Sequence, residues 1–353
     1  MTDRLGATKP HYQILDGLRG VAALLVVVFH LFEGIDPSLA THPMRHGYLA
    51  VDFFFLLSGF VVGYAYDDRW GSMTVGQFFR IRLIRLHPMV IVGALIGAVG
   101  FWLDPFKSLR PPSGLSDLLL AMVLAMVLMP SPDIRGWGET HQLNGPSWSL
   151  LQEYIGNILY GILVRRFSKI ALGLLVVCCA GALIYTAITN GHLGTGWSYE
   201  TFWIAVVRML FPFFAGLLLF RLGKIIRLKQ AFLISAGILA LTFFIPYNNY
   251  NGLMEALIII IIYPIVVAIG AGGTVSGWGE KVCKFLGDIS YPIYITHYPF
   301  IYVYTMWIYE QKPTQAEIAP VAIGLFVLFI LLAYGLLKGY DEPVRRWLKG
   351  RKV

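Results

Sequence analysis

Apolar runs recur along the chain from Leu18 to Leu337, and only short polar segments separate them. A helix needs about 20 mostly apolar residues to cross the hydrocarbon core of a bilayer. This pattern predicts an all-α, polytopic transmembrane helix bundle. The candidate spans are residues 18–32, 48–66, 86–103, 115–129, 148–164, 170–189, 203–220, 231–246, 253–271, 289–309 and 318–337.

Most basic residues gather in a few of the polar segments between the apolar runs, which places these basic loops and the C-terminal tail on the cytoplasmic side. Successive spans must alternate in direction across the membrane. Two cytoplasmic termini therefore require an even number of spans, and the eleven candidates include one too many. The segment from Leu115 to Met129 has to begin and end on the same side, so we expect it to be re-entrant or interfacial, beside about ten true spans. The basic loops are residues 80–85, 165–169, 221–229 and 281–284, followed by the tail 338–352.

The composition agrees with a protein whose solvent is lipid. Hydrophobic residues make up 57% of the 353 residues and charged residues 14%, against about a quarter charged in soluble proteins. We therefore expect one membrane-embedded domain over residues 1–353, with short cytoplasmic tails at 1–15 and 338–353. The expected location is the cytoplasmic (inner) membrane.

The net charge and the cysteines add two expectations. The net charge of +8 comes from the basic loops, so it sets orientation in the membrane, and we expect membrane lipids but no nucleic acid as partners. The three cysteines, Cys178, Cys179 and Cys283, suit neither a disulfide framework nor a metal cluster. No metal is expected.

The first apolar run carries the most informative motif. It starts at Leu15-Asp16-Gly17-Leu18-Arg19-Gly20 and ends near His30. In a helix, Arg19 and His30 lie on nearly the same face, about 16 Å apart along the axis. A histidine inside a span indicates function by default, but for His30 alone a hydrogen bond to a neighbouring helix is an equal alternative.

Two carboxylates are expected at the depth of His30. Helical rise places Glu153 about 9 Å below the outer edge of its span, and Asp52 near the outer start of the second span. A histidine base needs a carboxylate that holds its tautomer and stabilises the imidazolium. We expect Glu153, followed one turn later by Asn157, to be this partner. Asp52 is the second candidate, and its alternative is a charge stabilised by a helix N-terminus.

A basic cluster, Arg80-Ile81-Arg82-Leu83-Ile84-Arg85, precedes the third span. Arg82 and Arg85 are three residues apart and share a helix face. Guanidinium groups bind phosphate oxygens in a fixed fork, so this pair predicts a phosphate site. The alternative is ordinary anchoring of a cytoplasmic loop.

Two further segments place polar groups at membrane depth. Ser147-Trp148-Ser149 follows Pro146 as a helix start without a nucleophile-elbow pattern, so we expect direct transfer without an acyl-serine intermediate. The segment from Tyr291 to His297 places His297 near mid-membrane. That histidine either lines an acyl tunnel or is a hydrogen-bonded packing residue.

Together these segments resemble acyltransferase family 3, membrane proteins that O-acylate glycans and other hydroxyl acceptors. The resemblance implies that Arg19, His30, Arg82 and Arg85 bind and use acyl-CoA, with acetyl-CoA as the default donor. It is carried by the Asp16 and Arg19 motif with His30, residues 47–60 around Asp52, Arg82 with Arg85 and Pro88, Trp148-Ser149-Leu150 with Glu153, and Tyr291-Pro292-Ile293-Tyr294 with His297.

The expected reaction joins these parts. Acyl-CoA docks at the cytoplasmic end of the bundle, and a hydroxyl of a glycan, lipid-linked sugar or other acceptor enters from the outer side. His30 removes the proton of this hydroxyl, and Glu153 stabilises the resulting imidazolium. The rival interpretation is a proton-coupled transporter or flippase of a glycan precursor, because intramembrane His, Glu and Asp also form proton relays. Paired broken helices in inverted repeats would favour the rival, and the sequence shows no such pairing.

Overall fold

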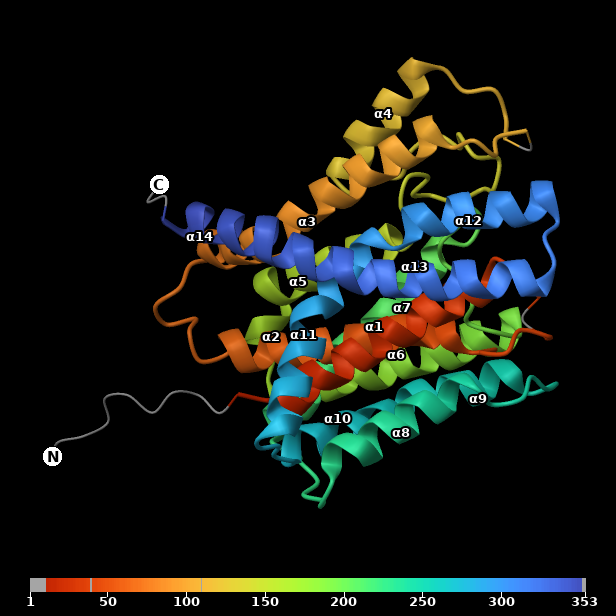
Figure 1. Ribbon diagram of the computed structural model, residues 1–353. Helices are drawn as coiled ribbons and strands as arrows, with labels where there is room; N and C mark the ends of the chain where they lie inside the picture. The colour runs from red at the N-terminus through yellow and green to blue at the C-terminus, as the bar shows by residue number, and fades with distance from the viewer. Residues whose placement is uncertain (1–10, 39, 109, 351–353) are drawn as a thin grey trace, which may run out of the picture.

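The computed structural model describes residues 11–38, 40–108 and 110–350, and within these ranges the chain is almost entirely helical (Figure 1). Its only paired extended backbone there is a single bridge between Glu139 and Ser198. The helices are α1 Gln13–Glu33, α2 Ala50–Tyr66, α3 Val75–Leu103, α4 Leu115–Met126, α5 Ser147–Ile162, α6 Lys169–Asn190, α7 Phe202–Leu222, α8 Ala231–Phe243, α9 Asn251–Leu257, α10 Tyr263–Gly272, α11 Trp278–Thr296, α12 Tyr298–Gln311, α13 Gln315–Leu336 and α14 Glu342–Gly350.

The predicted all-α membrane bundle is confirmed. In the described part of the chain, seven helical stretches are long and apolar enough to cross a membrane: α1, residues 47–66, α3, α6, α7, residues 251–272 and residues 315–350. The other predicted spans fall on shorter or less apolar helices, which are α5, α8 and the pair α11 and α12. Two of the long stretches contain π-helical segments, Ile258–Ile262 and Leu337–Asp341.

The bundle is built around α1, which packs along α11, while α2 packs along α7. Close approach at both contacts depends on glycine. A Cβ on Gly20 would lie 2.4 Å from the carbonyl oxygen of Leu286, and one on Gly59 would lie 1.7 Å from that of Phe213. Small residues of this kind let membrane helices pack backbone to backbone. Gly20 of the sequence motif therefore has a packing role.

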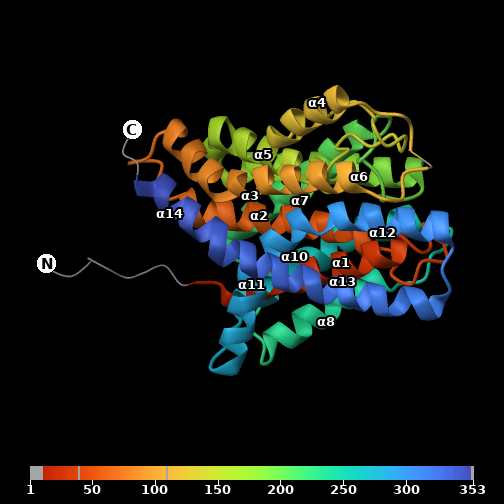
Figure 2. The same cartoon turned by 45° about the horizontal axis from the view of Figure 1, so that its top comes forward.

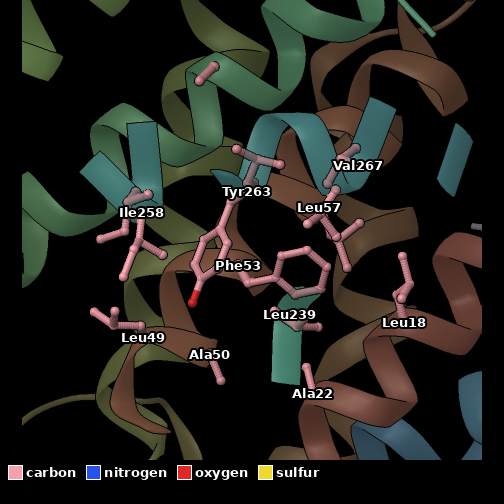
Figure 3. Close-up of a cluster of buried hydrophobic side chains, with 14 of the residues drawn as sticks. Leu18, Ala22, Leu49, Ala50, Phe53, Leu57, Leu239, Ile258, Tyr263 and Val267 are labelled. Carbon is pink, nitrogen blue, oxygen red and sulfur yellow. The ribbon is translucent and has the colours of Figure 1, made fainter. Parts of the chain in front are cut away.

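Buried side chains from α1, α2, α8 and α10 meet in one cluster. Figure 3 shows Phe53 against Tyr263, whose ring centroids lie 5.4 Å apart in an edge-on arrangement. Leu18 and Ala22 of α1 join the same cluster, and each is fully buried. This packing holds α1 and α2 together and so positions the polar residues that both helices carry.

The segment predicted to be re-entrant forms α4, which has only 12 residues. A helix of that length rises about 18 Å, too little for a hydrocarbon core of about 30 Å. Figures 1 and 2 show α4 running back beside α3, against which it packs. Ser113 Oγ donates a hydrogen bond to the Ile134 carbonyl at 3.2 Å, so the chain has returned to the start of α4 by Ile134.

Three expectations about element boundaries are wrong. The basic cluster at residues 80–85 is not a loop, because α3 already begins at Val75, where Thr74 and Gln77 form a capping box. The span expected over residues 289–309 is broken at His297 into α11 and α12, and Pro299 lies at the start of the second helix. Residues 338–350 are not a tail but continue the last helix through a π-helical segment into α14.

Candidate functional site

Residues of α1 line two cavities in the described part of the bundle. The first has a volume of 290 Å³ and is lined by Arg19, Arg82, Arg85, Arg345, Ser58 and Glu153, among others. We call it the arginine cavity. The second has a volume of 480 Å³ and is lined by His30, Glu33, Glu139, Trp148, Arg208 and Tyr298, among others. We call it the histidine cavity. Val51 and Tyr294 line both.

The arrangement follows from the helical period of α1. Arg19 and His30 are both on this helix, and eleven residues bring a side chain back to nearly the same face about 16 Å further along. Both residues lie within one uninterrupted α-helix, as the expected shared face requires, and they line two cavities that share Val51 and Tyr294. The start of α1, the first part of α3 and α14 lie at one end of the bundle (Figures 1 and 2).

Four guanidinium groups meet in the arginine cavity. Arg82 is buried and donates to Glu153 Oε1 at 2.7 Å, and its Nε has no partner among the described residues. Arg19 is held by Ser290 Oγ at 2.9 Å and by Asp16 at 2.9 Å. The cavity thus carries fixed donors for an anion.

The fourth guanidinium belongs to Arg345 of α14, which pairs with Asp341 at 2.6 Å. Asp341 is buried and lies in the π-helical segment that precedes α14, where its Oδ1 has no partner in the described part of the chain. π-helical insertions occur frequently at functional sites. Sequence reasoning missed Arg345 because it assigned residues 338–353 to a tail, of which residues 351–353 lie outside the described residues.

His30 has a carboxylate partner, but it is neither of the two expected. Glu33 Oε2 lies 2.7 Å from His30 Nδ1, one helical turn further along α1. Residues three apart on a helix are neighbours, so the spacing itself could have identified Glu33. When Nδ1–H donates to Glu33, the lone pair of Nε2 is left available as a base.

The prediction that Glu153 pairs with His30 is wrong. Glu153 lines the arginine cavity, where it accepts hydrogen bonds from Arg82 and from Ser58 Oγ at 2.8 Å. The first residues of α5, Ser147 and Trp148, are buried within the protein. The position of Glu153 along α5 therefore does not give its depth below an exposed helix end.

Asp52 is also not the partner of His30. It is fully buried and forms an ion pair with Arg208 of α7, at 2.5 Å and 3.2 Å. Arg208 lines the histidine cavity and lies 5.4 Å from the centre of the Trp148 ring. Asp52 does not itself line the histidine cavity and is linked to it through Arg208, a residue that the sequence analysis did not single out. Trp148, a candidate from the sequence, itself lines the histidine cavity.

The remaining candidates take supporting positions. Asn157 donates to the Glu153 carbonyl at 2.7 Å within α5. His297 is buried behind His30, with ring centroids 5.4 Å apart, and its Nδ1 lies 2.8 Å from the Ile293 carbonyl. This hydrogen bond matches the packing alternative for His297. Asp16 pairs with Arg19 and with His11 at 2.9 Å.

A loop residue that the sequence analysis did not single out also reaches the histidine cavity. Glu139 is buried, accepts a hydrogen bond from Tyr302 and pairs through its backbone with Ser198. Burial raises the pKa of Glu139 to about 7. Within residues 11–38, 40–108 and 110–350, no three His, Cys, Asp or Glu side chains are grouped to hold a metal ion.

Comparison with known proteins identifies the family to which this chain belongs. The chain matches a family model described as an acyltransferase domain over residues 12–338. Protein 2 in the picA locus of Rhizobium radiobacter is 35% identical over 158 residues, which are 42% of this chain and 79% of that protein. Acyltransferase MdmB of Streptomyces mycarofaciens is 31% identical over 173 residues, which are 47% of this chain and 43% of that protein.

A longer match covers nearly the whole chain. Peptidoglycan O-acetyltransferase OatA of Listeria monocytogenes is 26% identical over 375 aligned positions, which cover 96% of this chain and 56% of that protein. The chain thus spans a little over half the length of this relative. No solved structure matches the chain.

Proposed function

Because this chain belongs to acyltransferase family 3, we propose that it transfers an acyl group, by default acetyl, from acyl-CoA to a hydroxyl of a glycan or glycolipid. One observation carries the proposal. A single helix, α1, presents Arg19 to one cavity and His30 to another, and the two cavities meet at Val51 and Tyr294. A donor in the first cavity can thus meet an acceptor in the second.

The arginine cavity is suited to the phosphates of CoA. Arg82, Arg85, Arg19 and Arg345 provide guanidinium groups that bind phosphate oxygens in a fork. Glu153 and Asp341 neutralise part of this charge in the resting state. The pantetheine arm then extends toward the histidine cavity, over a distance of the order of the 16 Å that separates Arg19 from His30 along α1.

The histidine cavity holds the groups for acyl transfer. His30 removes the proton of the acceptor hydroxyl, and Glu33 holds the ring and stabilises the imidazolium. The hydroxyl oxygen bonds to the thioester carbon, the carbon–sulfur bond breaks, and the imidazolium returns its proton to the leaving thiolate. The products are an ester and free CoA. No acyl-enzyme intermediate is required.

The proposed orientation follows the distribution of basic residues. The end of the bundle that bears Arg82, Arg85 and α14 is rich in arginine and lysine, and such ends face the cytoplasm. Acyl-CoA, a cytoplasmic metabolite, would then enter from that side, and the acceptor would enter from the outside of the cytoplasmic (inner) membrane. Both termini would be cytoplasmic.

The glycan acceptor is proposed from two sources. One long relative is named a peptidoglycan O-acetyltransferase, which is a statement about that protein. The histidine cavity of this chain is lined by aromatic rings, including Trp137, Trp197 and Tyr309. Aromatic faces beside a few carboxylates suit the apolar faces and hydroxyl groups of a sugar ring.

The proposal is tested by following release of free CoA from acetyl-CoA by the purified protein in lipid nanodiscs, with an extract of the native cell envelope as acceptor. A general base contributes about 10² to 10⁴ in rate, so His30→Ala should lower kcat by at least about 100-fold. Arg82→Ala should raise KM for acetyl-CoA about 10-fold or more, because a charge-assisted hydrogen bond contributes about 1.5 to 3 kcal/mol.

His87→Ala is the matched control. His87 is half-buried in α3, lies 3.4 Å from the Tyr154 hydroxyl and is not among the residues that line either cavity. It should retain the wild-type rate. Full transfer by the His30 variant would refute the base. Proton-driven solute uptake without use of acetyl-CoA would favour the rival transporter.

A further inference from the structure

The arginine and histidine cavities share part of their lining. Val51 of α2 and Tyr294 of α11 are the two residues that line both. Each side chain is almost fully buried, with 9% and 8% of its surface exposed. They therefore form the wall between the space that holds the arginines and the space that holds His30.

Tyr294 is held in place on two sides. Its hydroxyl lies 2.7 Å from Ser149 Oγ. Ser149 donates its own proton to the Pro146 carbonyl at 2.8 Å, so it accepts the proton of Tyr294. The ring of Tyr294 packs edge-on against Phe54, with centroids 5.3 Å apart. A phenol with both ends fixed in this way cannot swing aside without losing a buried hydrogen bond.

We propose that Val51 and Tyr294 set the length of the acyl group that the protein transfers, and that they select a short one such as acetyl. The inference rests on the proposed function. With CoA in the arginine cavity and the base in the histidine cavity, the thioester carbon has to lie between these two side chains. Each added methylene then meets Val51, Tyr294 or the space beyond them.

The space beyond the wall does not relieve this restriction. The histidine cavity has a volume of 480 Å³, but the acceptor has to occupy it next to His30. A longer acyl chain that extends past Val51 competes with the acceptor for that volume. Pockets that distinguish one methylene do so by about 10- to 200-fold in kcat/KM, so a two-carbon extension should be strongly disfavoured.

The test compares acetyl-CoA with butyryl-CoA in the nanodisc assay. Val51→Ala opens the wall without adding a polar group, and the ratio of kcat/KM for butyryl-CoA to that for acetyl-CoA should rise at least about 10-fold. Val51→Leu enlarges the side chain and should lower the same ratio. The two variants move the ratio in opposite directions, so a general loss of stability does not mimic the result.

Val62→Ala is the matched control, because Val62 is on the same helix, is fully buried and is not among the residues that line either cavity. Its ratio should stay at the wild-type value. A wild-type protein that turns over acetyl-CoA, with a ratio that changes less than twofold in both Val51 variants, would overturn the selection by Val51 and leave the proposed function in place. A wild-type protein that turns over neither thioester would overturn both.

Discussion

Replacement of Glu33 by Gln tests the ion pair beside the proposed base. Glu33 Oε2 lies 2.7 Å from His30 Nδ1, and the two side chains are 36% and 16% exposed. Unit charges 4 Å apart attract by about 1 kcal/mol in water and by about 4 kcal/mol at an effective dielectric of 20. Partial exposure places this pair between the two limits. A loss of about 1.4 to 2.8 kcal/mol of imidazolium stabilisation predicts a 10- to 100-fold lower kcat.

The assay is again release of CoA in nanodiscs, with kcat and KM for acetyl-CoA measured separately. KM should change little, because Glu33 lies in the histidine cavity and the phosphates of CoA would bind in the arginine cavity. Glu200→Gln, at an exposed loop position outside both cavities, is the control and should match the wild type. A kcat within twofold of the wild type in Glu33→Gln would refute the role of this carboxylate.

Three further predictions concern other parts of the molecule. Arg345→Ala should raise KM for acetyl-CoA about 10-fold, whereas Arg346→Ala, at the exposed neighbouring position, should leave KM unchanged. The same KM in both variants would show that α14 takes no part in binding the donor. Asp52→Ala leaves Arg208 buried without its carboxylate, which costs about 3 to 5 kcal/mol, so the Tm of the purified protein should fall by about 10 °C; an unchanged Tm would contradict this. Burial raises the pKa of Glu139 from 4.5 to about 7, so the folded state favours the protonated carboxyl and its contribution to stability is lost as pH rises from about 4.5 through 7; Glu139→Gln should flatten the dependence of Tm on pH over that range, and an unaltered slope would contradict the assignment.

Much of the fold could be predicted from periodicity alone. Runs of apolar residues identify the membrane helices. The count of spans from both ends predicts that residues 115–129 do not cross the membrane, in agreement with the short helix α4. The spacing of Arg19 and His30 correctly placed them on one face of one helix, since a helical period depends only on sequence separation. Arg82 and Arg85 line one cavity, as their spacing of three predicts.

The partner of each charged group could not be predicted in the same way. Depth below a membrane surface locates a side chain only when the start of its helix is known, and α5 begins inside the protein, so Glu153 was assigned to the wrong cavity. Asp52 was paired by depth with His30, although Arg208 on α7 lies closer. These contacts depend on which helices pack together, a long-range property that the local pattern does not contain.

A structure of the protein in nanodiscs, bound to a non-reactive thioether analogue of acetyl-CoA, tests the central claim most directly. The account predicts the phosphates among Arg19, Arg82 and Arg85, and the carbonyl that replaces the thioester between Val51 and Tyr294, facing His30. Phosphates bound elsewhere, or a carbonyl separated from His30 by an intact wall, would contradict it.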